Sequence, residues 1–351
     1  MAHLAHPRNC KMKVSLIIRE YILLTRMRLW FYTGFIPVSG ALAMGMIEIR
    51  QLALLYIIGC LAHIRGFTMN DLFDREFDKN SPFVMSRPLA KGTISRTSAL
   101  ILIGISLLMT WFIIAVSFLN WGTALMALAA PLLGAAYNLA GKKILGSDVI
   151  LAMSFFCVCL TGSFSVSTEV TSAAILISLF WAFNVLYLNL IAGLKDLEFD
   201  MKSGAKTLAI ALGGRAKREI VKISKPLKFT LFLIWLSQTA IISALFLNPR
   251  LQDGYFQSPF LPLFIFILEI SIIGVHIRIL KLREANTRSL ARLVSLPIIL
   301  NFLLVFLLLA PLTGIFIPIV IYIISLSWSL LFNFLTYGKP TVGLPPKKKM
   351  G

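Results

Sequence analysis

The chain has 351 residues, of which 58% are hydrophobic and 14% are charged, and its formal net charge is +19. The apolar fraction exceeds that of an ordinary soluble domain, which argues against a soluble globular protein. The positive charge would suit a nucleic-acid partner, but membrane topology and attraction to anionic headgroups explain it as well. We therefore expect membrane lipids, and no nucleic acid, among the partners.

Apolar residues gather in blocks nearly free of charge, each about as long as a helix needs to cross roughly 30 Å of hydrocarbon. Ten such blocks cover residues 30–47, 52–69, 98–119, 121–138, 149–167, 173–194, 228–248, 260–280, 293–312 and 314–336. Only a short stretch around Pro311 and Gly314 separates the last two, so a re-entrant or broken helix and nine crossings are the alternative. The sequence predicts an all-α membrane protein, a polytopic transmembrane helix bundle with nine or ten crossings.

Lysine and arginine residues gather on alternate connections between the blocks. With the N-terminus on the cytoplasmic side, they all fall on that side except Arg50 and Arg250 outside and Arg65 within the second block. The positive-inside rule therefore predicts an integral, multi-pass protein with both termini cytoplasmic. No cleavable signal peptide is evident before the first block. We predict a cytoplasmic segment over 1–29, a single transmembrane domain over 30–336 and a basic cytoplasmic tail over 337–351.

A first acidic cluster, Asn70-Asp71 with Asp74 and Asp78, follows the second block. If the helix of that block continues through the cluster, the three carboxylates lie within a sector of about 60°. Like charges so close together destabilise a helix unless a cation neutralises them, and oxygen ligands suit a hard ion such as Mg²⁺. The pattern favours a metal site over a solvated acidic helix end.

A second acidic cluster follows the sixth block. Asp196 and Asp200 are about one helical turn apart and face one way, whereas Glu198 lies about 200° from Asp196 and is left out of the metal set. Both clusters follow even-numbered crossings and so fall on the cytoplasmic side. Mg²⁺ commonly takes one or two carboxylates together with substrate phosphates. Two clusters on one side therefore predict a phosphate-bearing ligand between them.

At these residues the sequence resembles the UbiA superfamily of intramembrane prenyltransferases, whose hallmarks are Asn-Asp-x-x-Asp-x-x-x-Asp and a later Asp-x-x-x-Asp. The resemblance spans roughly residues 25–215 and also includes Arg87-Pro88-Leu89, Gly92, Ser95, Tyr137, Lys142, Gly204 and Thr207. The chain departs from the family's pattern at Arg26-Met27, where members often carry Arg-Pro, and at Phe83, where an arginine is usual. A tenth crossing also exceeds the nine of most members.

The resemblance implies a helical bundle around a central cavity, capped by cytoplasmic loops and open laterally to lipid. It implies an enzyme, a prenyltransferase, that uses Mg²⁺ to transfer a prenyl group from an allylic polyprenyl diphosphate donor to a lipophilic or aromatic acceptor, releasing diphosphate. The acceptor that we favour is an aromatic, 4-hydroxybenzoate-like quinone precursor. A carotenoid or polyprenyl chain, a glycerol phosphate lipid and a terpene cyclase reaction stay open as alternatives.

The roles that follow fall on few residues. The expected catalytic residues are Asp71, Asp74, Asp196 and Asp200, the metal ligands are these four with Asn70 and Asp78, the diphosphate-binding residues are Arg65, Arg87, Lys142 and Tyr137, and Asn189 is a candidate for the acceptor or cavity. Arg65 is a costly cation within an apolar block, which indicates a function, although a salt bridge to an aspartate is the alternative. Tyr137 as a simple membrane anchor and Asn189 as an interhelical hydrogen-bonding group also stay open.

A cation transporter is the alternative of another class, because carboxylates within membranes often mark ion paths. Here the acidic residues lie at the ends of blocks among basic residues, not near mid-membrane, and no inverted repeat is evident. The sequence therefore favours the prenyltransferase.

Overall fold

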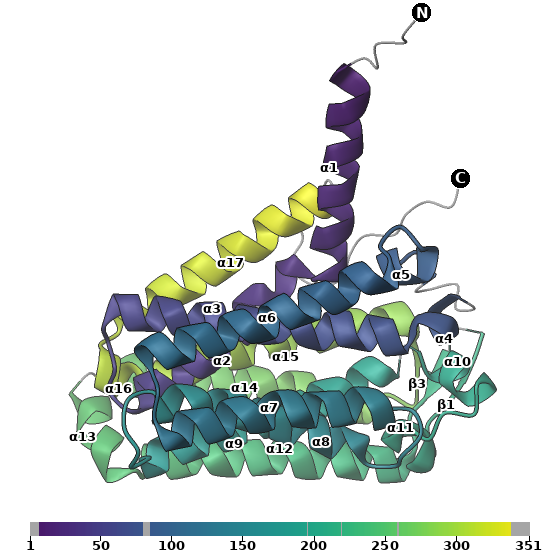
Figure 1. Cartoon of the computed structure of the whole chain (residues 1–351). Coiled ribbons are helices and arrows are strands. Elements are labelled where there is room, and N and C mark those ends of the chain that lie inside the picture. The colour runs from purple at the N-terminus through teal and green to yellow at the C-terminus, as the bar shows by residue number, and fades with distance from the viewer. Residues whose placement is uncertain (1–6, 80–84, 195, 219, 258–259, 338–351) are drawn as a thin grey trace, which may run out of the picture.

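The computed structural model describes residues 7–79, 85–194, 196–218, 220–257 and 260–337, and its long helices run side by side in a bundle (Figure 1). Each of the ten predicted blocks forms a helix: α2 (Trp30–Ala43), α3 (Ile49–Phe73), α6 (Arg96–Ser117), α7 (Trp121–Ala140), α8 (Ser147–Phe164), α9 (Ser172–Gly193), α12 (Lys225–Phe246), α14 (Phe260–Lys281), α15 (Thr287–Leu308) and α17 (Phe316–Tyr337). Among the described residues, eight helices are long and apolar enough to span a membrane, whereas α2 and the apolar part of α15 are shorter. The predicted all-α membrane bundle is confirmed.

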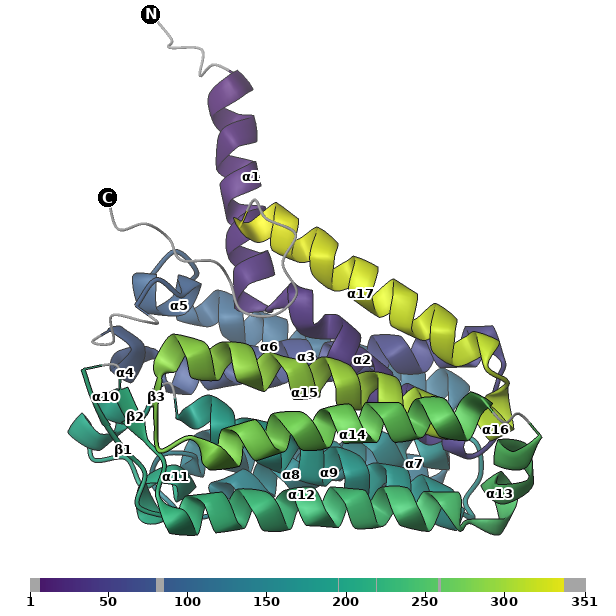
Figure 2. The same cartoon turned by 180° about the vertical axis from the view of Figure 1, so that it is seen from behind.

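The last two blocks form separate helices. Between α15 and α17 lie the short helix α16 (Ala310–Thr313) and Gly314, whose φ of 74° ends it. The neighbouring α13 (Pro249–Phe256) closes the same end of the bundle (Figure 2). From there α17 returns obliquely along the bundle, where Trp328 donates a hydrogen bond of 2.8 Å to the Met27 carbonyl. The tenth block is therefore a full-length helix rather than part of a re-entrant pair.

The opposite end of the bundle carries the short elements that contain the motifs (Figure 1). They are α4 (Arg75–Lys79), α5 (Pro88–Lys91), α10 (Leu197–Lys202), α11 (Leu208–Ala211), β1 (Arg215–Lys217), β2 (Ile220–Lys222) and β3 (Glu284–Asn286). The strands form an antiparallel sheet in the order β1-β2-β3, with Val221 of β2 opposite Ala216 and Ala285. Both acidic clusters therefore lie at one end, as predicted. The helix α1 (Pro7–Leu24) and the 3-10 helix η1 (Met27–Leu29) precede the bundle.

The bundle core is held by close helix approach and by aromatic packing. A Cβ added at Gly162 of α8 would lie 1.7 Å from the Pro37 carbonyl oxygen of α2, so only glycine admits this contact. Small residues commonly let membrane helices approach in this way. Nearby, Phe302 of α15 contacts Phe31 and Phe35 edge-on, with centroids 5.5 and 5.9 Å apart. These contacts fix the helices that carry the site residues at their ends.

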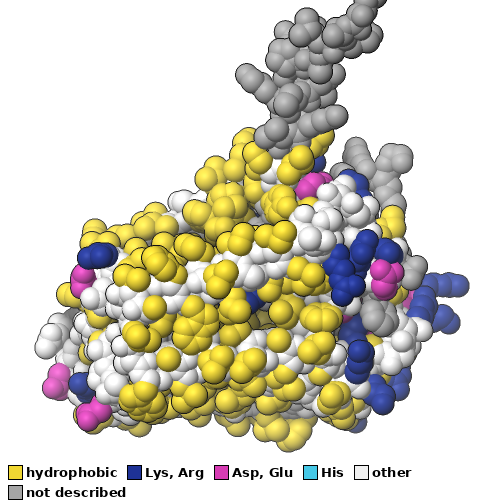
Figure 3. All heavy atoms as spheres, viewed as in Figure 1, with side chains coloured by type: hydrophobic (Ala, Val, Ile, Leu, Met, Phe, Trp, Pro, Cys, Tyr) yellow, Lys and Arg dark blue, Asp and Glu magenta, His cyan; other side chains and the backbone are white. Residues whose placement is uncertain are grey.

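The surface is apolar along the flank and basic at the motif end (Figure 3). On α6, for example, Leu108 and Phe112 expose 71% and 63% of their surface. Such exposure of contiguous large apolar side chains fits a lipid environment, because it would cost free energy in water. The basic residues near α4, α5 and α10 make this end of the bundle the more strongly charged of the two ends that would meet an aqueous phase.

Candidate active site

The first acidic cluster is built where α3 ends. Asp71 lies in the last turn of α3 with its side chain 2% exposed, and Asp74 forms the C-cap. The condition that this helix continues unbroken through Asp78 is not met, because α3 ends at Asp74 and the separate helix α4 follows, although the Asp78 N–H still donates a hydrogen bond of 2.8 Å to the Asp74 carbonyl. The Asn70 side-chain amide donates a hydrogen bond of 3.2 Å to Asp74 Oδ2. The amide oxygen of the same Asn70 side chain is therefore available as a metal ligand.

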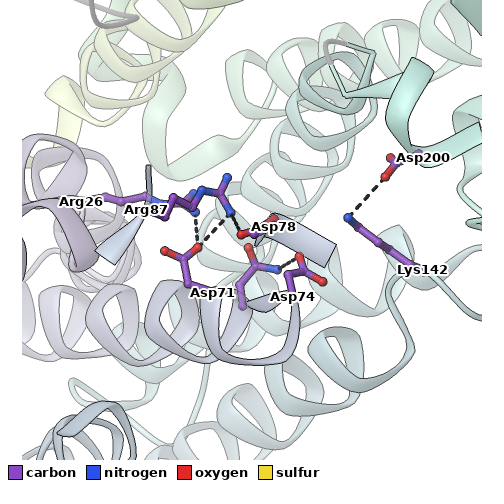
Figure 4. A network of polar contacts seen from close by, with 8 residues as sticks. Arg26, Asp71, Asp74, Asp78, Arg87, Lys142 and Asp200 are labelled. Atoms are coloured by element: carbon purple, nitrogen blue, oxygen red, sulfur yellow. Dashed lines mark hydrogen bonds and ion pairs between the residues drawn. The ribbon is translucent and has the colours of Figure 1, made fainter. Parts of the chain in front are cut away.

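Two guanidinium groups hold this cluster together (Figure 4). Arg26 Nη2 lies 2.7 Å from Asp71 Oδ1, and Arg87 Nη1 lies 3.1 Å from the same oxygen and 2.8 Å from Asp78 Oδ2. Arg87 thus compensates for the helix break, because it draws Asp78 back toward Asp71. Sequence reasoning noted Arg26 only as a departure from the family's pattern, and its contact with Asp71, 45 residues away, has no local signal.

The residues after the first motif position Arg87. Pro88 occupies the first turn of α5, where its missing N–H is harmless, and Leu89 is fully buried. Gly92 ends α5 with a φ of 80°, a conformation that favours glycine. Arg75 Nε donates a hydrogen bond of 3.1 Å to the Leu89 carbonyl and so ties α5 to α4. The Arg-Pro-Leu pattern therefore positions the Arg87 side chain next to Asp71 and Asp78.

The second acidic cluster begins the short helix α10. Asp196 is its N-cap and accepts a backbone hydrogen bond from Asp200, so the two residues stand one turn apart as predicted. Asp200 is 5% exposed, and its Oδ1 lies 3.3 Å from Lys142 Nζ (Figure 4). Glu198 instead pairs with Lys202 at 2.9 Å on the surface, which agrees with its exclusion from the metal set.

Lys142 is held in place by the loop of the second cluster. Its carbonyl accepts a hydrogen bond of 2.9 Å from the Lys206 N–H. Two residues shape this loop: Gly204 has a φ of 72°, and Thr207 caps α11 by accepting a hydrogen bond from the Ile210 N–H. These contacts explain why a glycine and a threonine follow the second aspartate pair.

The carboxylates of the two clusters act on one another electrostatically. Burial raises the pKa of Asp200, Lys142 lowers it, and Asp196 and Asp74 raise it further. Burial likewise raises the pKa of Asp78 to about 6, against the opposing effect of Arg87. The Asp74 carboxylate therefore lies within electrostatic range of the second cluster. A divalent cation near both clusters would relieve this crowding of negative charge.

The donor set fits a hard divalent cation that retains other ligands. The described residues contain no group of three or more His, Cys, Asp or Glu side chains already gathered around one point. The carboxylate and amide oxygens stand instead in two half-sites with basic residues between them. This arrangement suits Mg²⁺, which dehydrates reluctantly and often shares its coordination with substrate phosphates.

Arg65 stands apart from both clusters. It is 8% exposed, and its Nη1 has no hydrogen-bond partner among the described residues. At 100° per residue it lies about 120° around α3 from Asp71, and no ion pair joins it to a described carboxylate. The alternative of a salt bridge is therefore not formed in the described part of the chain. Contact with the diphosphate stays a prediction, and the separation of about 120° from Asp71 around the helix argues against it.

Replacing Arg65 with methionine is expected to leave the KM for a prenyl diphosphate within about twofold of the wild type and to maintain or raise thermal stability. The reason is that a buried cation without an ion-pair partner costs free energy within the membrane. The matched change Arg87→Met removes the contacts to Asp71 and Asp78 and should raise this KM at least about tenfold. An equal rise of this KM in both variants would show that Arg65 contacts the diphosphate.

Tyr137 and Asn189 meet beside the site. Asn189 Nδ2 lies 3.3 Å from the Tyr137 hydroxyl and 2.5 Å from Asp148 Oδ1. Asn189 is thus joined to a predicted diphosphate-binding residue, while its expected role toward the acceptor stays a prediction. Asp148 was missed, because an acidic residue at the start of an apolar block shows no spacing that relates it to either partner.

Other polar residues within the bundle serve helix packing. Asn184 donates a hydrogen bond of 2.8 Å to the Tyr32 hydroxyl and accepts one of 3.0 Å from Asn301. Glu269 accepts a hydrogen bond of 2.9 Å from the Thr239 hydroxyl of a neighbouring helix. These contacts join helices without involving the acidic clusters.

The fold and the site define an integral, multi-pass membrane protein with two acidic half-sites and their basic partners at one end. The chain belongs to the UbiA prenyltransferase family, whose model matches residues 34–270. This confirms the predicted superfamily and the predicted class of enzyme, a prenyltransferase.

Individual relatives agree with this assignment. The chain is 31% identical over 202 residues to the digeranylgeranylglyceryl phosphate synthase of Thermococcus kodakarensis, a match that covers 56% of this chain and 69% of that protein. It is 28% identical over 177 residues to the 4-hydroxybenzoate octaprenyltransferase of Francisella tularensis subsp. novicida, covering 50% of this chain and 62% of that protein. The names of the two relatives specify different prenyl acceptors, so similarity alone does not identify the acceptor of this chain.

Solved structures share the fold. A UbiA homologue from Aeropyrum pernix K1 superposes with a TM-score of 0.60 at 15% identity, covering 80% of this chain and 95% of that one. A UbiA homologue from Archaeoglobus fulgidus, bound to GPP and Mg²⁺, superposes with a TM-score of 0.56 at 19% identity, covering 82% and 99%. At these identities the likeness establishes the arrangement of helices.

Proposed function

We propose that this chain uses Mg²⁺ to transfer a prenyl group from an allylic prenyl diphosphate to a lipophilic acceptor in the membrane, with release of diphosphate. The observation that carries the proposal is the pair of acidic clusters, close enough for Asp74 to raise the pKa of Asp200, with Lys142 between them. The Archaeoglobus homologue bound to GPP and Mg²⁺ supports the same ligand chemistry.

The proposed site divides its work between two kinds of side chain. The metal ligands are Asn70, Asp71, Asp74, Asp78, Asp196 and Asp200, with Asp71, Asp74, Asp196 and Asp200 as the catalytic carboxylates. Mg²⁺ bound there would neutralise the negative charge that develops on the leaving diphosphate. Arg87, Lys142 and the Tyr137 hydroxyl would donate hydrogen bonds to phosphate oxygens, and Arg26 joins them through its contact with Asp71.

The acceptor that we propose is aromatic, a 4-hydroxybenzoate-like quinone precursor. The Francisella relative named 4-hydroxybenzoate octaprenyltransferase supports this choice. A glycerol phosphate lipid is the second candidate, which the 31% identity to the Thermococcus digeranylgeranylglyceryl phosphate synthase favours. Both acceptors would be prenylated by the same ionisation of the donor, so the metal site is common to the two proposals.

We further propose that the motif end of the bundle faces the cytoplasm, with both termini on that side. Support comes from the distribution of basic residues, because Arg50 opens α3 and Arg250 lies in α13, both at the opposite end. The donor would then enter from the side on which the basic loops lie.

The proposal is tested with the purified full chain in lipid, a labelled prenyl diphosphate and a panel of acceptors that includes 4-hydroxybenzoate and a prenylated glycerol phosphate. We expect diphosphate release and one prenylated product, both lost when the metal is chelated and both restored by added Mg²⁺. Mass spectrometry identifies the product. Release of diphosphate with a cyclic product and no prenylated acceptor would indicate a cyclase, and the absence of release under all conditions would refute the proposal.

A further inference from the structure

Three side chains from three helices meet beside the acidic clusters. Tyr137 lies in the last turn of α7, Asp148 lies in the first turn of α8, and Asn189 lies near the end of α9. The Asn189 amide nitrogen is within hydrogen-bond distance of both others, at 2.5 Å from Asp148 Oδ1 and 3.3 Å from the Tyr137 hydroxyl. Tyr137 also lies within electrostatic range of Asp74 and Asp200. The group therefore borders the proposed diphosphate site.

The chemistry of Asp148 fixes the direction of every hydrogen bond in this group. An ionised carboxylate only accepts, so the Asn189 side chain must present its NH₂ group to Asp148. The Asn189 nitrogen is the atom that lies 2.5 Å from Asp148 Oδ1, and Asp148 stands in the first turn of α8, where a helix dipole stabilises negative charge. The second hydrogen of the same NH₂ group then points to the Tyr137 oxygen. Tyr137 consequently accepts from Asn189, and its own O–H proton must point elsewhere.

We propose that Asp148 is a positioning residue for the transfer reaction, because it orients Asn189 so that the Tyr137 hydroxyl presents its proton to the leaving diphosphate. This inference rests on the proposed function. As the bond between the prenyl carbon and the diphosphate oxygen breaks, its electron pair passes to that oxygen, and the Tyr137 O–H donates a hydrogen bond to the growing charge. Tyr137 keeps its proton throughout.

A second amide network in the same bundle shows what the carboxylate adds. In it Asn301 donates to the Asn184 carbonyl oxygen, and Asn184 donates to the Tyr32 hydroxyl. There one amide donates to the other, no charge takes part, and both asparagines are buried. Packing alone is thus achieved without an ionised group. The carboxylate of Asp148 in the network of Tyr137 therefore indicates that this residue orients the Asn189 amide and does more than pack the helices.

The decisive experiment is a double-mutant cycle between Asp148→Asn and Tyr137→Phe, measured as diphosphate release by the full chain in lipid. Asp148→Asn alone is expected to lower kcat at least about tenfold while the KM for the prenyl diphosphate changes less than about threefold, since the lost interaction forms mainly in the transition state. In the Tyr137→Phe background the same change should have no further effect on kcat. A further loss of similar size in that background would overturn the proposal.

The exchange of the two side chains separates orientation from packing. In the variant Asp148→Asn with Asn189→Asp, a hydrogen bond between the two positions forms again, but a carboxylate now faces Tyr137 and attracts its proton. We expect thermal stability near that of the wild type and a kcat as low as that of Asp148→Asn. Recovery of kcat in the exchanged variant would show that only the contact matters and would refute the inference.

Controls keep this inference distinct from the proposed function. Asp253→Asn makes the same chemical change at an exposed residue of α13, at the opposite end of the bundle, and should leave kcat and stability unchanged. If the wild-type chain released no diphosphate, the proposed function would fail. If the wild type were active and Asp148→Asn equally active, the role of Asp148 alone would fail.

Discussion

Replacing Asp71 with alanine is expected to lower diphosphate release at saturating donor and Mg²⁺ by at least about 100-fold. Asp71 accepts hydrogen bonds from both Arg26 and Arg87 and lies buried in the last turn of α3. Its loss removes a proposed metal ligand and also leaves two guanidinium groups without their shared partner. The measurement is steady-state diphosphate release by the chain in lipid, with folding checked by thermal unfolding.

The control for Asp71→Ala is Glu76→Gln, which removes a carboxylate from the same stretch. Glu76 pairs with Lys79 at 2.9 Å and is largely exposed, and an exposed pair of this kind contributes little. Glu76→Gln should therefore retain nearly full activity. Diphosphate release by folded Asp71→Ala at a rate near that of Glu76→Gln would exclude Asp71 from the metal site.

The second large effect is expected from Asp200→Asn, which should lower diphosphate release by at least about 100-fold and raise the Mg²⁺ concentration needed for half activity. The change preserves shape but removes the charge that faces Lys142 at 3.3 Å. Lys142 then loses its ion pair with residue 200, and the second cluster loses one proposed metal ligand. A titration with Mg²⁺ measures both effects in one experiment.

Glu198→Gln is the matched control for Asp200→Asn, because both residues lie in α10 but their side chains have different partners. Glu198 pairs with Lys202 on the surface, whereas Asp200 is 5% exposed and lies within range of Asp74. Normal Mg²⁺ dependence is expected for Glu198→Gln. A shift of the Mg²⁺ requirement in this variant, with none in Asp200→Asn, would reverse the assignment of the second cluster.

Much of the fold follows from local composition. Each of the ten apolar blocks forms a helix, because a backbone within hydrocarbon must satisfy its hydrogen bonds internally and helices do so within one segment. The second aspartate pair also obeys local rules, since Asp196 and Asp200 stand one turn apart in α10. In contrast, the break at Asp74 was not predicted. The contacts of Arg87 with Asp71 and Asp78, which join the two sides of this break, also lie outside any local pattern.

The sequence by itself determined the membrane bundle, the placement of both acidic clusters at one end and the basic partners Arg87 and Lys142. These features depend on residues near one another in the chain, or on helices whose alternation dictates the side on which each loop lies. Only the tertiary structure brought Arg26 to Asp71, left Arg65 Nη1 without a hydrogen-bond partner among the described residues and joined Asp148 to Asn189. Such contacts join separate helices, and the rotation of each helix about its axis is decided by packing against its neighbours.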